Sequence, residues 1–382
     1  MQMLQSFLED KPLFYDEIDL ERMPKIYQGI KDHLSIPKII HIVGTNGKGT
    51  TGRFLANALL QNSLNVGHYT SPHILKFNER IWLNGHDVDD LRLEEAHCKL
   101  MGLLTPQDAD ALSYFEYTTL LAMVIYEPCD YVVLEAGLGG EFDATNVFAK
   151  VLSLFTKIDK DHESFLGSEL EEIAGTKMRS MQSSAILGLQ KHASIKTTFK
   201  RIASEKNVTA FEIQNILTQE KQEQINTIAA QYHLPKYLQE NLLLAISALV
   251  FLGYSADIEV LAKAPLFGRL SKIRANVYLD VGHNALAAEA IASTLQGEKF
   301  TLIYNSYRDK DYEQILEILR PIITDIELID VDDVRVEQEA LLTAVINAKK
   351  IPLTKYDTIV EDKNYLVFGS FSVAEAFLRS LS

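Results

Sequence analysis

The stretch KIIHIVGTNGKGT, residues 38–50, joins a short apolar run to a glycine-rich loop. The run from Lys38 to Val43 is typical of a strand buried on both faces of a parallel sheet. After the loop, apolar residues recur at helical spacing from Phe54 to Leu59. Backbone N–H groups and the positive end of a helix dipole meet at such a strand-to-helix turn, and both favour phosphate. The stretch therefore predicts an α/β fold with a phosphate-binding loop at Gly44–Thr50.

Within this loop the side chains suit a triphosphate. Lys48 can reach the outer phosphates, and the Thr50 hydroxyl can ligate Mg²⁺. The spacing departs from the common G-x-x-x-x-G-K-[ST] pattern, since the outer glycines are closer and Gly49 follows the lysine. A glycine-rich turn without a ligand is the alternative, and the flanking strand and helix favour the phosphate site.

Further strands and helices alternate along the chain. Residues 1–37 are expected to form a helical lead-in, and Asn84-Gly85 a hairpin turn between Trp82 and Val88. Other expected strands are Val66–Tyr69, Asp130–Glu135 and Val151–Ile158, with a strand–helix–strand unit between Ser183 and Phe211. Expected helices are Leu120–Tyr126, Gln214–Tyr232 and Asn241–Leu252. This alternation predicts a mostly parallel sheet with crossover helices on both faces.

A second domain is expected after the stretch APLFGR, Ala264–Arg269, which interrupts the pattern. The length of 382 residues predicts more than one domain. We divide the chain into residues 1–265, a P-loop-type ATPase domain, and residues 266–382, a smaller Rossmann-like α/β domain. Its expected strands are Val277–Val281, Phe300–Tyr304, Ile326–Val331 and Tyr365–Phe368.

Composition excludes several classes of partner. The chain has 37 basic and 52 acidic side chains, so its net charge is −15. Nucleic acids and anionic membranes both require a basic surface. The two cysteines, Cys98 and Cys129, are too few for a disulfide framework or a structural zinc site. The N-terminus is acidic, and no apolar run approaches the ~20 residues of a membrane span. We expect a cytoplasmic monomer that binds neither nucleic acid nor membrane.

Acidic residues end two predicted strands. Glu135 lies at the carboxyl end of a parallel strand, where such sheets bind ligands, and could hold Mg²⁺. A solvent-exposed acid is the alternative, but the following LGGEFDATN, with Asp143 and Asn146, favours a site. Asp280 occupies a similar position in the second domain, where a helix cap is equally consistent with the local sequence.

Two further residues have open interpretations. His162, in the charged loop DKDHE, could be a metal ligand or simply solvated. Lys177 lies in the helical stretch ELEEIAGTKMRSM, and its spacing alone indicates a surface lysine. The stretch Asp309–Asp311 by itself reads as a charged loop.

Together the motifs resemble the folylpolyglutamate synthase and dihydrofolate synthase family, a branch of the Mur-type ligases. The matching blocks follow one another along nearly the whole chain: HIVGTNGKGT, TSPHILKFNERIWLNG, SYFEYTT, VVLEAGLGGEFDATN, DHESFLG, QENLLLAISAL, FGRL, LDVGHN, DKD and VFGSF. The TSPH…NERI…NG block and LGG-x-x-DATN are specific to this branch.

The resemblance implies a role for each site residue. The nucleotide-binding set comprises Thr45, Asn46, Gly47, Lys48, Gly49, Thr50, Asn241, Arg269 and Asp280. The implied ligands of Mg²⁺, with two ions expected, are Ser71, Glu135 and His162. The implied catalytic residues are Lys48, His162 and Lys177, the last carbamylated. The implied lining of the pterin pocket is Tyr114, Phe115, Glu116 and Asp143.

The implied reaction is ATP-dependent amide formation through an acyl phosphate, joining L-glutamate to dihydropteroate and to reduced folates. The alternatives are a peptidoglycan-type Mur ligase and a nucleotide-dependent switch protein. Three residues depart from the family pattern: Glu141 replaces an arginine, Thr176 a glutamate and Phe267 a proline. We expect Glu141 to weaken binding of the additional carboxylates of folates, so that dihydropteroate is the better substrate.

Overall fold

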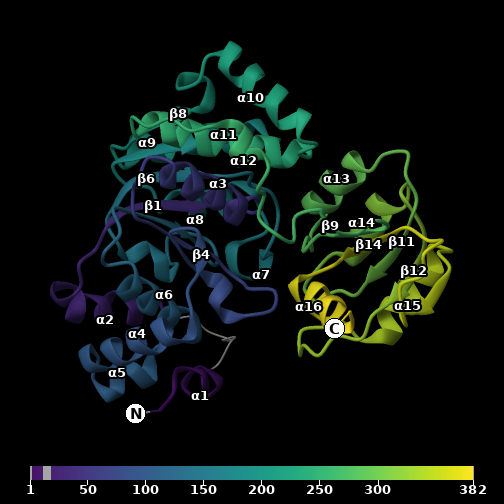
Figure 1. Cartoon of the computed structure of the whole chain (residues 1–382), viewed down its shortest axis with the longest axis horizontal. Coiled ribbons are helices and arrows are strands. Elements are labelled where there is room, and N and C mark those ends of the chain that lie inside the picture. The colour runs from purple at the N-terminus through teal and green to yellow at the C-terminus, as the bar shows by residue number, and fades with distance from the viewer. Residues whose placement is uncertain (1, 12–18, 382) are drawn as a thin grey trace. The chain divides into compact units, whose positions relative to one another are not determined.

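The chain folds into two compact units (Figure 1) in a computed structural model that describes residues 2–11 and 19–381. The first unit contains residues up to Leu234 and Leu238–Ala264, and the second contains Pro235–Tyr237 and Pro265 onward. The expected helical lead-in is two helices, α1 (Leu4–Glu9) and α2 (Arg22–Ile30). The part of that lead-in between them, residues 12–18, lies outside the described residues.

The first unit is built on an eight-stranded sheet. Its strands, in spatial order, are β4 (His86–Asp87), β3 (Ile81–Leu83), β2 (Val66–Tyr69), β5 (Tyr131–Glu135), β1 (Lys38–Val43), β6 (Lys150–Phe155), β7 (Ser184–Leu187) and β8 (Thr209–Glu212). The run from β2 to β8 is parallel, and only β3 and β4 are antiparallel. This confirms the predicted mostly parallel sheet. The hairpin between β3 and β4 turns at Asn84 and Gly85, both at positive φ, as an Asn-Gly turn requires.

Helices cover this sheet. They are α3 (Lys48–Leu60), α4 (Asp90–Leu103), α5 (Pro106–Ala111), α6 (Tyr114–Ile125), α7 (Glu163–Leu166), α8 (Leu170–Met178), α9 (Ala193–Glu205), α10 (Gln219–Gln231), α11 (Lys236–Phe251) and α12 (Ile258–Ala262). Single 3₁₀ turns are η1 (Lys31–His33), η2 (Phe77–Arg80), η3 (Ala144–Val147) and η4 (Ile213–Asn215). One apolar core joins the sheet to α1, α2, α4 and α6, and another joins it to α8 and α9.

The second unit has a six-stranded sheet. Its order is β13 (Leu353–Lys355), β12 (Ile323–Leu328), β11 (Phe300–Tyr304), β14 (Tyr365–Phe368), β10 (Val277–Leu279) and β9 (Ser271–Arg274). All neighbours are parallel except β9 and β10. The helices are α13 (Ala285–Thr294), α14 (Tyr312–Leu319), α15 (Glu339–Ala348) and α16 (Phe371–Ser380). The sequence did not predict β9 and β13, because these short edge strands are partly exposed and lack an apolar run.

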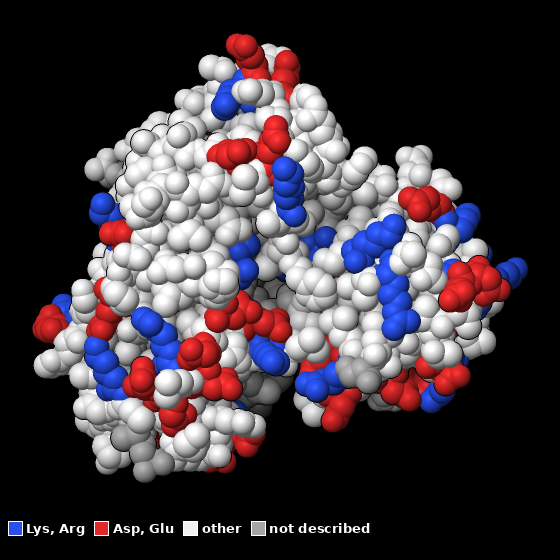
Figure 2. Space-filling model, viewed as in Figure 1, with Lys and Arg blue, Asp and Glu red and all other residues white. Residues whose placement is uncertain are grey.

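The described surface carries charges of both signs. Figure 2 shows acidic and basic side chains interspersed on one face. No helix among residues 2–11 and 19–381 is sufficiently long and apolar to cross a membrane. Cys98 is exposed and Cys129 is buried, and both are free thiols.

The packing of β2 against the end of α6 requires glycine at position 67. A Cβ added to Gly67 would collide with the ring of Tyr126, whose hydroxyl donates a hydrogen bond of 2.8 Å to the carbonyl of His68. Overpacking of this kind costs about 1–3 kcal/mol. We therefore expect Gly67→Ala to lower the urea midpoint of the first unit. Trp82, the single tryptophan, lies in neighbouring β3 and makes fluorescence a reporter of this unit.

Gly102→Ala, near the end of α4, is the matched control. A Cβ there meets no atom within 4 Å, so alanine should raise the midpoint by reducing the entropy of the unfolded chain. Equal midpoints for the two variants would contradict this account of the β2–α6 contact.

Candidate active site

The glycine loop is docked onto the chain that follows β6. The N–H groups of Thr45 and Asn46 donate to the carbonyl of Lys157 at 2.9 and 3.3 Å. The Thr45 hydroxyl donates to the carbonyl of Asp159 at 2.9 Å and accepts from the N–H of Asp159 at 3.1 Å. These groups of Thr45 and Asn46 fix the loop, so their predicted contact with the nucleotide must use other atoms and stays a prediction.

Two positions in the loop require glycine. A Cβ on Gly44 would collide with the Thr156 hydroxyl, and one on Gly47 would collide with the Asn241 carboxamide. Gly47 is also the N-cap of α3 and has a φ of 91°, which strains other residues. The helix that begins at Lys48 leaves its first N–H groups without intrahelical acceptors, as an anion site needs. Asn241 thus lies against the phosphate loop.

The Lys48 side chain lies over the loop. Its Nζ donates to the carbonyls of Gly44 and Thr45, each at 3.3 Å, and lies 3.9 Å from Oε1 of Glu135. The carbonyl bonds are long, and a phosphate oxygen is a stronger acceptor for an ammonium group. The lysine and the carboxylate therefore lie together at the carboxyl ends of β1 and β5.

Thr50 and Glu135 carry oxygen atoms that could bind a divalent ion. The Thr50 hydroxyl is buried and has no hydrogen-bond partner among the described residues. Glu135 is 5% exposed and accepts a hydrogen bond from Thr70, the residue before Ser71. Hydroxyl and carboxylate oxygens are the ligands that Mg²⁺ prefers. Among the described residues no three His, Cys, Asp or Glu side chains are grouped as metal ligands. The residues fit Mg²⁺.

Ser71 and His162, the other predicted metal ligands, approach from neighbouring segments. Ser71 follows β2, which pairs with β5, so it lies at the same sheet edge as Glu135. His162 precedes α7 at a φ of 54°, and its Nε2 is 4.0 Å from Oδ1 of Asp161. Their metal ligation stays a prediction.

Lys177 is buried, so its interpretation as a surface lysine from helical spacing is wrong. Its side chain is enclosed beneath the glycine loop, and Nζ donates to the carbonyl of Gly44 at 3.2 Å. Burial, with nearby Lys48 adding repulsion, lowers the pKa of Lys177 to about 7. The error arose because the glutamates of α8 indicate one solvated face but do not show what the opposite face contacts.

Aromatic side chains gather near the loop that follows β5. The Phe115 ring lies over Gly137, where a Cβ would be 2.7 Å from the ring, and its centroid is 6.0 Å from that of Tyr69. The Tyr114 ring is 5.2 Å from the guanidinium of Arg80. Phe115 and Tyr114 begin α6, and their predicted role in a pterin pocket stays a prediction.

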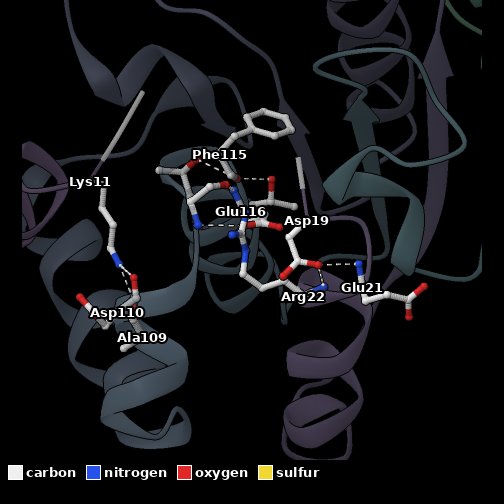
Figure 3. A network of polar contacts seen from close by, with 11 residues as sticks. Lys11, Asp19, Glu21, Arg22, Ala109, Asp110, Phe115 and Glu116 are labelled. Carbon is white, nitrogen blue, oxygen red and sulfur yellow. Dashed lines mark hydrogen bonds and ion pairs between the residues drawn. The ribbon is translucent and has the colours of Figure 1, made fainter. Parts of the chain in front are cut away.

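Glu116 has structural partners (Figure 3). Its Oε2 accepts from the N–H of Ser113 at 2.8 Å, which completes the capping box of α6, and from Nε of Arg22 at 2.8 Å. Asp19 in turn accepts from the N–H groups of Glu21 and Arg22 at the start of α2, and Lys11 donates to the carbonyls of Ala109 and Asp110. The Glu116 carboxylate thus ties α2 to α6, beside Phe115.

Asp143 likewise organises backbone. Its Oδ1 accepts from the N–H of Thr145 at 3.0 Å, and its Oδ2 accepts from the N–H of Leu138 at 2.8 Å. Burial raises the pKa of Asp143, and these hydrogen bonds act against the rise. The carboxylate holds the loop that carries Gly137, and direct contact with a substrate stays a prediction.

Thr70 and Lys150 were not predicted from the sequence as residues of the site. Thr70 binds Glu135, and the only available signal was its position at a strand end beside Ser71. Lys150 is buried, and its Nζ donates to Oδ1 and O of Asn146 at 2.7 and 3.1 Å. Desolvation lowers the pKa of Lys150 to about 7. The position of Lys150 at the start of an apolar strand was the signal in the sequence that it is buried.

Glu141 forms an ion pair with Arg179, and its N–H donates to the carbonyl of Thr176 at 2.9 Å. The Glu141 side chain is 27% exposed. The pair compensates much of the negative charge that we expected to repel substrate carboxylates, so the expected repulsion is smaller than the sequence alone indicates.

The second unit holds Arg269 and Asp280. Asp280 accepts from the N–H groups of Leu270 and Gly282 at 2.8 and 2.7 Å and from the Tyr237 hydroxyl at 3.0 Å. The Arg269 guanidinium is 5.5 Å from the centre of the Phe371 ring. Asp280 therefore shapes the chain around Arg269, and ATP contact by either residue stays a prediction.

Relatives with known names identify the family, although no family model matches the chain. A Bacillus subtilis protein named dihydrofolate synthase/folylpolyglutamate synthase is 30% identical over 329 residues, 75% of this chain and 74% of that protein. A Haemophilus influenzae protein of the same name is 39% identical over 171 residues, 44% of this chain and 38% of that protein.

Solved structures have the same fold over nearly all of this chain. Helicobacter pylori folylpolyglutamate synthetase shares 39% identity and a TM-score of 0.79, with 99% of this chain and 97% of that chain covered. Escherichia coli FolC in complex with DHPP and ADP shares 25% identity and a TM-score of 0.83, with 98% and 96% covered. On this similarity in sequence and fold, the chain belongs to the dihydrofolate synthase/folylpolyglutamate synthase family.

Proposed function

We propose that this protein is an ATP-dependent ligase that joins L-glutamate to dihydropteroate and to reduced folates. The observation that carries the proposal is the grouping of Lys48, Glu135 and buried Lys177 around one glycine loop. Relatives named for this activity cover most of the chain, and the related E. coli structure contains ADP and DHPP. Membership in this family also favours the ligase over a peptidoglycan-type Mur ligase.

The chemistry follows from these residues. A carboxylate of the substrate attacks the γ-phosphorus of ATP, and ADP leaves as the acyl phosphate forms. The amine of glutamate then attacks the acyl carbon, and phosphate leaves. Lys48 stabilises the charge of the transferring phosphoryl group from the loop, and Glu135 and Thr50 would hold Mg²⁺ there, with Ser71 and His162 as further ligands. When bound, Mg²⁺ would act as a Lewis acid that offsets the negative charge of the phosphate oxygens.

Lys177 supplies a second anionic ligand once carbamylated. Its amine must be neutral to attack CO₂, and a pKa of about 7 leaves a large neutral fraction at physiological pH. The carbamate replaces a cation next to Lys48 with an anion, so it relieves repulsion there and favours a second Mg²⁺. We infer two ions on this basis. A nucleotide-dependent switch, the remaining alternative, would release ADP without a pterin and glutamate.

Removing the loop cation tests the nucleotide site. Lys48→Ala is expected to lower kcat by about 10²–10³ or more, because the transferring phosphoryl group loses its main protein cation. The measurement is ADP release with dihydropteroate and glutamate. Lys221→Ala, an exposed lysine on α10, is the control and should retain the rate. Near-normal turnover in Lys48→Ala would refute the phosphate-loop assignment.

Carbamylation of Lys177 predicts chemical rescue. Lys177→Ala should lose activity and regain part of it with acetate, while the unaltered enzyme should need bicarbonate and lose activity as the pH falls below about 7. Alkylative trapping of carbamates, followed by peptide mass spectrometry, should label Lys177. Lys150 is equally buried but hydrogen-bonded to Asn146, so it should remain unlabelled. Full activity of Lys177→Ala without acetate would remove this residue from the mechanism.

Glu141 predicts the order of substrate preference. We expect kcat/KM to be higher for dihydropteroate than for tetrahydrofolate, because the latter has more carboxylates to be repelled. Arg179→Met removes the partner of Glu141 and should widen the difference, mainly by raising KM for tetrahydrofolate. Glu141→Gln should reduce the difference in kcat/KM between the two substrates. A preference for tetrahydrofolate that neither substitution changes would contradict a role of Glu141 in recognition.

A further inference from the structure

Arg80 is a buried arginine at the edge of the candidate active site. It ends η2, directly before β3, and is 8% exposed. Its backbone carbonyl accepts from the N–H of Thr70 at 3.0 Å, and Thr70 binds Glu135. Thr70 therefore links the backbone of Arg80 to Glu135 and precedes Ser71, both predicted metal ligands. The Arg80 side chain lies over the Tyr114 ring.

Its side-chain partners do not neutralise its charge. Nε donates to Nδ1 of His73 at 2.8 Å. A ring nitrogen that accepts a hydrogen bond carries no proton, so His73 is a neutral partner of Arg80. Among the described residues, no carboxylate oxygen lies within 4 Å of the Arg80 guanidinium nitrogens.

The carboxylate of Glu79, the residue before Arg80, binds backbone N–H groups. Glu79 accepts from the N–H groups of Ile74, Leu75 and Lys76 at 2.7, 2.9 and 2.8 Å. These bonds hold the loop that leads into η2. The Glu79 carboxylate therefore forms no ion pair with the Arg80 guanidinium. Arg22, by contrast, has its charge compensated by Glu116 at 2.8 Å. A buried arginine without an anion disfavours folding, since desolvation of its charge is not repaid.

We propose that Arg80 binds the carboxylate of the aromatic acid substrate, an inference that rests on the proposed function. The guanidinium presents planar donors to a carboxylate, and Nη1 and Nη2 have no protein acceptor among the described residues. The Tyr114 ring lies beside the guanidinium, and the Phe77 ring packs against Tyr114 with the centroids 6.4 Å apart, so the two rings offer faces and edges to a flat molecule. This aromatic setting favours an aromatic carboxylate over a nucleotide phosphate, for which Lys48 and the glycine loop are already placed.

The test compares a ligand that has the carboxylate with one that lacks it. Dihydropteroate and its uncharged carboxamide are titrated by calorimetry into the unaltered protein, Arg80→Met and Arg80→Lys. Arg201→Met, an exposed arginine on α9, is the matched control. The unaltered protein and the control should bind the carboxylate at least about tenfold more tightly than the carboxamide. Arg80→Met should bind both equally, Arg80→Lys should be intermediate, and KM for ATP should stay within about twofold.

Thermal stability separates recognition from a structural role. Methionine fills the space of Arg80 without a buried charge, so the melting temperature of Arg80→Met should equal or exceed that of the unaltered protein. A lower melting temperature with unchanged discrimination would assign Arg80 to the fold. If Arg80→Met does not fold, the intermediate ratio expected for Arg80→Lys decides the matter.

Two further outcomes overturn the inference. Unchanged discrimination with a raised KM for ATP would assign Arg80 to the nucleotide. Unchanged discrimination with normal turnover would remove it from recognition and leave the proposed ligase intact. Absence of ADP release that depends on dihydropteroate and glutamate in the unaltered protein would instead refute the proposed function, and the inference with it.

Discussion

The parallel pairing of β2, β5, β1 and β6 is the constraint on which the site depends. Parallel strands place their carboxyl ends at one edge, so segments distant in sequence must emerge together. Ser71 follows β2, Glu135 ends β5, Gly44 follows β1 and Thr156 follows β6. A slip of one residue between β1 and β5 would turn Glu135 to the opposite face of the sheet and away from Lys48. The apolar register of the sheet therefore positions the polar chemistry.

The side chains at this edge of the sheet include several cations, although the chain as a whole is acidic. The protein carries a net charge of −15, yet Lys48, Lys177 and Arg80 lie at or beneath one group of strand ends. Two of these cations are buried, and the pKa of Lys177 is lowered as a result. Such a cluster disfavours the empty protein and favours any polyanion that brings its own charge. Free energy lost on folding is recovered when the substrates bind.

The sequence predicted the central strands and the glycine loop, because continuous apolar runs and glycines are local signals. Edge strands such as β9 and β13 were missed, since pairing at an edge needs no apolar pattern. The burial of Lys177 and the absence of a carboxylate beside Arg80 among the described residues depend on contacts between distant segments, which spacing cannot show. For Glu116, the structure gives the carboxylate a helix cap and an ion pair with Arg22, and the substrate contact implied by the family pattern stays a prediction. Local sequence thus identifies candidate residues better than it assigns their partners.

The reciprocal hydrogen bonds of Thr45 and Asp159 have a consequence for local unfolding. The loop cannot leave its position without releasing the segment after β6, because one hydroxyl both donates to and accepts from that segment. The two stretches should therefore open as one cooperative unit, with a shared free energy of opening. A ligand held by the loop raises that free energy for both stretches. The backbone N–H of Asp159, whose carboxylate pairs with Lys191 ahead of α9, would then be protected from hydrogen exchange by a ligand that Asp159 does not touch.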